Sequence, residues 1–148
     1  MIAQEKAIQE AMKARVALTL PGFSELAYSE DVAKNNFRQT AKRYAVRVLD
    51  SVQIGGVTRH TTFDHSFELV LTDQYFETNI DDRKKTEATL NLRGDVYEAY
   101  RDLVRSKAGL PSQVMNVNNL VLSEPEYLTD AKVVVQRATL TVTARLAL

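Results

Sequence analysis

The sequence predicts an α+β fold in which antiparallel β-hairpins form a sheet and helices pack on one of its faces. Three observations support this prediction. Apolar residues recur at helical spacing near the N-terminus, two long regions alternate between apolar and polar residues, and a second helical stripe lies between those regions. The expected order of elements is α-β-β-α-β-β, and hairpins joined to helices in this way form a two-layer sandwich.

The bulk composition narrows the class of protein. The chain has 148 residues, which fits a single domain spanning 1–148. Nineteen basic and nineteen acidic residues cancel, which lowers the expectation that DNA is the main ligand, because phosphate neutralisation supplies most DNA-binding affinity. The absence of cysteine excludes disulfides, thiolate metal sites and cysteine nucleophiles, and it fits folding in a reducing cytoplasm. No apolar run approaches the ~20 residues that span a bilayer.

The first 22 residues predict an amphipathic helix. Ile8, Met12 and Val16 recur every four residues, and Pro21-Gly22 ends the pattern. Charged residues occur throughout this segment, so we do not interpret it as a signal peptide. The next stretch, 22–42, has weak periodicity. A surface loop and an extended arm both fit it, and a short helix beginning after Ser29 as N-cap also stays open.

A long β-hairpin is predicted from Arg43 onward. Between 43 and 54 the even positions are mainly apolar and the odd positions mainly polar, which is typical of a half-buried strand. Gly55-Gly56 follows, and then a second alternating run begins. Because a tight hairpin turn needs positive φ at both central residues, we expect these glycines to form a two-residue turn.

This turn fixes a register that the charges support. Pairing across it places Arg47 opposite Asp64 and Arg43 opposite Glu68, so two ion pairs fall on the polar face. Each cross-strand pair contributes about 0.2–1 kcal/mol. A slip of one residue would mix the polar and apolar faces, so the agreement favours this register.

The two histidines of the chain, His60 and His65, are candidate metal ligands. Residues five apart in a strand point to opposite faces, so the two rings cannot converge on one ion. No cysteine or further histidine remains to complete a ligand set. We therefore expect no metal and no cofactor. We expect His65 to be buried on the apolar face, near Phe63 and Phe67 and opposite Val46, with a packing role.

No catalytic motif stands out in the sequence. The nucleophile-elbow motif and the glycine-rich phosphate loops are absent. Two alternatives stay open: an enzyme that uses Asp64 and Glu68 with help from His60, and a small-ligand or regulatory binding module with a ferredoxin-like layout. We predict no enzymatic activity and no catalytic residues. The residues we single out form a structural hairpin: Arg43, Arg47, Gly55, Gly56, Asp64, His65 and Glu68.

The second half of the chain predicts one helix and two strands. An apolar stripe, extended by Leu92 and Ala99, predicts a helix that starts after Asn79 or Asp81 and ends before Gly109 and Pro111. The stripe consists of Val96, Tyr100, Leu103 and Val104. Gly94-Asp95 is a candidate break within it. Strands are expected over 113–123 and 131–148, joined by a connection too long for a tight turn.

This arrangement resembles the tail terminator (tail-completion) proteins of tailed bacteriophages. The resemblance covers roughly 44–148. It is carried by "YAVRV", "FDHSFELVLTDQYF", "GDVYEAYRDLVRSKAGLP" and "ATLTVTARLAL". Neighbouring phage neck and minor tail proteins have similar α+β sandwiches, so they remain part of the expectation.

The resemblance implies a structural virion protein of the tail or neck that is assembled in the host cytoplasm. Such a protein forms a ring, hexameric in this family, that caps the tail tube and joins it to the head connector. The implied partners are copies of itself, the tail tube protein and the connector or stopper protein. No membrane, sequence-specific nucleic acid or catalytic residue is implied.

Overall fold

The computed structural model describes residues 2–26, 42–57, 60–75, 83–105, 109–128 and 132–147. The two helices in this part of the chain are α1 (Ile2–Thr19) and α2 (Arg83–Arg105). The strands are β1 (Ser24–Glu25), β2 (Arg43–Val57), β3 (His60–Gln74), β4 (Val114–Leu122), β5 (Glu126–Leu128) and β6 (Val133–Ala147).

All six strands belong to one sheet, in the order β1-β2-β3-β6-β4, with β5 also paired to β6. Only the β1–β2 pairing is parallel. The α+β prediction is confirmed. The predicted order of elements is wrong in two places, because β1 and β5 have only two and three residues and are too short to show a period. β1 lies in the stretch predicted as a loop or arm, of which residues 27–41 fall outside the described ranges.

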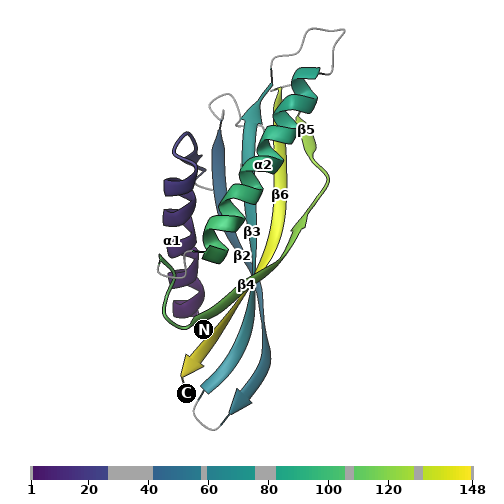
Figure 1. Ribbon diagram of the computed structural model, residues 1–148. Coiled ribbons are helices and arrows are strands. Elements are labelled where there is room, and N and C mark those ends of the chain that lie inside the picture. Colours follow the sequence, from purple (N-terminus) through teal and green to yellow (C-terminus); the bar gives the residue numbers. More distant parts are fainter. Residues whose placement is uncertain are drawn as a thin grey trace.

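Both helices pack on the same face of the sheet, and β2, β3 and β6 extend past the helix ends (Figure 1). The predicted stripe of Ile8, Met12 and Val16 is buried against this face. Burying a side chain of this kind contributes about 1.5–3 kcal/mol. The core between the layers is completed by residues from α2 and the central strands, including Leu92, Val96, Ala99, Leu103, Phe67, Leu69, Leu71, Leu140 and Val142.

α2 runs without a break through Gly94 and Asp95, so the candidate break in this helix is wrong. The helix continues because its buried positions keep one period on both sides of Gly94, from Leu92 to Val96. The expected caps, Asn79 and Asp81, lie outside the described residues.

Gly94→Ala is expected to stabilise the protein by about 0.5–1 kcal/mol, because alanine loses less backbone entropy in a helix interior. A Cβ at this exposed position would meet no atom within 4 Å. Chemical denaturation of the two proteins measures the difference. Equal or lower stability of the alanine variant would show that the α2 backbone is strained at this residue.

The sheet face turned away from the helices has a smaller apolar cluster of its own. Ala45, Val70, Val133 and Val135 are buried there, and Leu26 and Leu128 pack against them. The remainder of this face is largely polar, with threonines alternating along β6 opposite Asp64, Ser66 and Glu68 of β3. This cluster therefore stabilises only the half of the sheet nearest β1 and β5.

The predicted turn at Gly55-Gly56 is wrong. Both glycines lie within β2, paired with Thr62 and Thr61, and the hairpin reverses three residues later than predicted, between Val57 and His60. Neither glycine has positive φ, so the local reason for placing a turn there does not apply. The turn residues themselves, 58–59, lie outside the described part of the chain.

Because the turn comes later, each residue near the start of β2 lies opposite a residue of β3 that is four positions beyond its predicted partner. Arg47 lies opposite Glu68 instead of Asp64, and Arg43 lies opposite Thr72 instead of Glu68. Because four is an even number, the shift leaves each side chain on its predicted face. Burial was therefore predicted better than pairing.

Two bulges interrupt β2 after this first part. The first lies between Val48 and Ser51, and the second between Gln53 and Gly55. An extra residue reverses the in-out alternation of the strand beyond it. Val52 and Ile54, predicted on the apolar face, are consequently 55% and 54% exposed, and Ser51 turns towards His65 instead.

Candidate functional site

The predicted charged residues of the hairpin lie on the sheet face away from the helices, but with different partners. Arg47 Nη1 lies 3.7 Å from Glu68 Oε1. Asp64 accepts a hydrogen bond from the Thr143 hydroxyl across β6, at 2.6 Å. The predicted Arg47–Asp64 and Arg43–Glu68 pairs are absent from the register that the structure describes.

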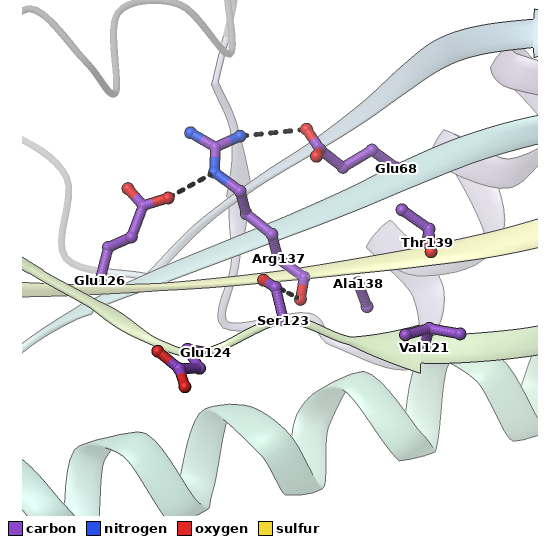
Figure 2. Close-up of a pocket in the computed structure, with 8 residues that line it drawn as sticks. All are labelled: Glu68, Val121, Ser123, Glu124, Glu126, Arg137, Ala138 and Thr139. Carbon is purple, nitrogen blue, oxygen red and sulfur yellow. Dashed lines mark hydrogen bonds and ion pairs between the residues drawn. The ribbon is translucent and has the colours of Figure 1, made fainter.

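Arg137 of β6 is the principal partner that sequence analysis missed. Its guanidinium lies 3.0 Å from Glu68 through Nη1 and 3.1 Å from Glu126 through Nε, and it points away from α2 (Figure 2). It joins β3, β6 and β5 on one face. In the sequence Arg137 is only an arginine at an odd position of the last strand. Its partners could not be predicted, because they depend on β6 lying next to β3.

A pocket of about 450 Å³ surrounds this arginine. The pocket lies beside β4 and the connection to β5, and its lining residues are Glu68, Val121, Ser123, Glu124, Glu126, Arg137, Ala138 and Thr139. Its best-placed polar groups bind one another: Arg137 occupies both Glu68 and Glu126, and the Ser123 hydroxyl donates to the Arg137 carbonyl at 3.0 Å. This pairing favours a structural role for the pocket over capture of a small ligand.

The two carboxylates considered for catalysis, Asp64 and Glu68, are four residues apart on one strand. At about 3.3 Å per residue their backbones are about 13 Å apart. Carboxylate pairs that act on one bond, as in glycosidases, lie about 5–9.5 Å apart. Of His60, the third member of that hypothesis, the structure describes the backbone alone.

His65 is fully buried, as expected, and its ring stacks on Phe63 with 6.0 Å between centroids. The prediction that Val46 lies opposite His65 is wrong, because Ser51 occupies that place in the register. The ring is hydrogen-bonded at both nitrogens, with Nδ1 2.7 Å from Ser51 Oγ and Nε2 2.8 Å from Gln4 Oε1. The Ser51 hydroxyl also lies 2.7 Å from Glu5 Oε1. His65 therefore has a polar role as well as a packing one.

This polar cluster attaches the first turn of α1 to the sheet. Gln4 Nε2 donates to the Arg145 carbonyl of β6 at 2.6 Å, and one turn later Gln9 Nε2 donates to the Val46 carbonyl of β2 at 2.8 Å. Three polar side chains, those of Gln4, Glu5 and Ser51, surround the histidine and form with it the polar counterpart of the apolar stripe. Sequence analysis missed them because polar residues at the start of a helix are ordinarily solvated.

Both long edges of the sheet are open within the described residues. Beyond the two residues paired with β1, the outer edge of β2 has no strand beside it, and β4 has β6 on one side only. Nine large apolar side chains in the described residues are exposed, and five of them lie on these two strands. They are Leu49, Val52 and Ile54 on β2 and Met115 and Val121 on β4.

Bulges account for this exposure at both edges. In β4 the register shifts at Met115 and again between Asn118 and Val121, and Asn119 has a φ of 57°. Asparagine tolerates this left-handed conformation better than most residues. Bulges re-aim side chains, so the two edges present apolar groups that regular strands would have placed elsewhere.

Within the described residues, no group of three or more His, Asp or Glu side chains is arranged to hold a metal ion. Neither α1 nor α2 is long and apolar enough to cross a membrane. No protein-family model matches the chain, and no curated protein resembles it significantly.

Proposed function

We propose that this protein is a structural, ring-forming component of a phage tail or neck, with the tail terminator as the position that its resemblance favours. The observation that carries the proposal is that the described residues leave two apolar sheet edges open, on opposite sides of one domain. Exposed edge strands are templates for pairing with another chain, and monomeric proteins usually protect them. In the part of the chain that the structure describes, both edges instead combine backbone groups that pair with no further strand with large apolar side chains.

The position of the two edges determines the kind of assembly. If β2 of one copy contacts β4 of the next, the contact joins two different surfaces and leaves one of each free. Such head-to-tail contacts form a ring when the rotation closes. A ring of this kind is what capping a tail tube requires, with the tail tube protein on one side and the connector protein on the other.

The test uses matched substitutions at the two edges. Val52→Asp combined with Ile54→Asp places two charges on the β2 edge, and Val121→Asp places one on the β4 edge. Both variants are expected to be monomers under conditions in which the unchanged protein forms rings, since each would bury unpaired charge. Leu18→Asp, at a 70% exposed position of α1, is the control and should still form rings. Native mass spectrometry measures all four.

Mixing the two edge variants distinguishes the mode of contact. Each retains the edge that the other has lost, so a head-to-tail contact predicts a heterodimer that grows no further. An unchanged protein that stays monomeric, even with tail tube protein added, would contradict the proposal. Rings formed by the edge variants would show that assembly uses another surface.

A further inference from the structure

The hydroxyl of Ser51 has one proton and two hydrogen-bond acceptors within reach. Its Oγ lies 2.7 Å from Nδ1 of His65 and 2.7 Å from Oε1 of Glu5. A serine hydroxyl donates one hydrogen bond and accepts others. Its proton therefore goes to the ring or to the carboxylate, and the protonation of Nδ1 decides which.

The other side of the ring fixes the tautomer of His65. Nε2 lies 2.8 Å from the side-chain oxygen of Gln4. The amide nitrogen of Gln4 donates to the Arg145 carbonyl at 2.6 Å, so the amide oxygen faces the ring. An amide oxygen can only accept, which means that Nε2 carries a proton whether the ring is neutral or charged. In the neutral ring Nδ1 is therefore the acceptor.

We propose that Ser51 is a proton-operated switch that couples the ionisation of His65 to the attachment of α1 to the β2–β3 hairpin. With a neutral ring, Ser51 donates to Nδ1 and gives no hydrogen bond to Glu5. When the ring gains a proton, Nδ1 donates to Ser51 Oγ and the hydroxyl proton turns to Glu5. Glu5, on α1, is then bound to β2. The switch holds whether or not the protein forms a ring.

The charges around His65 act on its pKa in opposite directions. Burial lowers the pKa of His65 most, and the amino terminus lowers it further, while Glu5 of α1 and Asp64 of β3 raise it. The net result is a pKa below the ordinary value of 6.5. The switch therefore works in acidic solution. The proton binds the unfolded chain more tightly, so the stability contributed by neutral His65 is complete above pH 6.5 and is lost as the pH falls towards the folded pKa.

The experiment follows both ends of the network by NMR during an acid titration. His60→Gln leaves His65 as the only histidine in the chain. We expect its ring to be the Nε2–H tautomer at neutral pH and to titrate below 6.5. The chemical shift of the Glu5 carboxyl carbon should show, besides the change caused by its own ionisation, a second change at the pH of the His65 midpoint. Ser51→Ala is expected to abolish that step.

A charge-matched pair of variants gives an independent measure. Glu5→Gln should move the His65 midpoint to lower pH, because it removes a carboxylate that favours the charged ring. Glu10→Gln, on the same helix but paired with Lys13 at 3.6 Å, should leave the midpoint unchanged. An Nδ1–H tautomer, a Glu5 step that persists in Ser51→Ala, or equal midpoints in the two glutamine variants would each overturn the proposal. If Ser51→Ala fails to fold, the tautomer of His65 and the comparison of Glu5→Gln with Glu10→Gln still test the proposal.

Discussion

Phe67→Ala is expected to lower the free energy of unfolding by about 3–5 kcal/mol, the largest effect of any single change considered for this protein. Phe67 is fully buried and belongs to the core cluster between the helices and the sheet. Truncation removes the buried ring and leaves a cavity that the long strands on either side, β2 and β6, cannot close. Urea denaturation followed by circular dichroism measures the change.

Tyr97→Ala is the matched control for this prediction. Tyr97 is also aromatic, but it is 54% exposed on α2, and its truncation should change stability by no more than about 0.5 kcal/mol. If Phe67→Ala unfolds the protein completely, Phe67→Leu offers a smaller step, expected to cost less than about 1.5 kcal/mol. A loss below about 1 kcal/mol for Phe67→Ala would place this residue outside the core.

Arg137→Met is expected to cost about 1–3 kcal/mol. The substitution keeps most of the aliphatic stem but removes the guanidinium that binds Glu68 and Glu126. The Glu68 side chain is only 13% exposed, so it cannot be fully rehydrated, and hydrogen bonds to charged groups contribute about 1.5–3 kcal/mol. Arg47, at 3.7 Å, replaces part of the lost interaction.

Arg101→Met tests whether the position matters more than the charge. The Arg101 side chain is 61% exposed and lies 3.9 Å from Glu98 on the same helix. Exposed pairs of this kind contribute about 0–1 kcal/mol, so little change is expected. Denaturation of both variants at low and high salt completes the comparison. Equal losses for Arg101→Met and Arg137→Met would show that Arg137 acts as an ordinary surface charge.

Helical periodicity predicted the packing of both helices because it depends on residues a few positions apart. The stripe of Ile8, Met12 and Val16 is buried, and so are Val96 and Leu103 of the second stripe. Tyr100, predicted in that stripe as well, is only half-buried, and the prediction for Val104 is wrong because its side chain is exposed. Spacing along a helix indicates the direction of a side chain, but the width of the buried face depends on the neighbouring layer.

Strand pairing was harder to predict because the residues next to one another in the sequence favoured a tight turn, whereas contacts between the two long strands favoured a later one. Gly55-Gly56 has the composition of a tight turn, yet the long apolar faces of β2 and β3 align best when the strand continues through it. The bulges have no clear signature in the sequence, so the exposure of Val52 and Ile54 could not be predicted from alternation. Arg137 required knowledge of which strand neighbours β3, which the order of elements leaves undetermined.

The bulge between Val48 and Ser51 gives the hairpin two segments with opposite phase. Deletion of one residue between Val48 and Ser51 would remove the extra residue of the bulge, so the strand beyond it would stay in register, with Ser51 opposite His65 and Val52 opposite Asp64. The same deletion in a regular part of β2 would instead move every side chain beyond it to the other face of the sheet. In evolution, the bulge is therefore a place where the loss of a single codon would shorten the strand without exchanging its two faces.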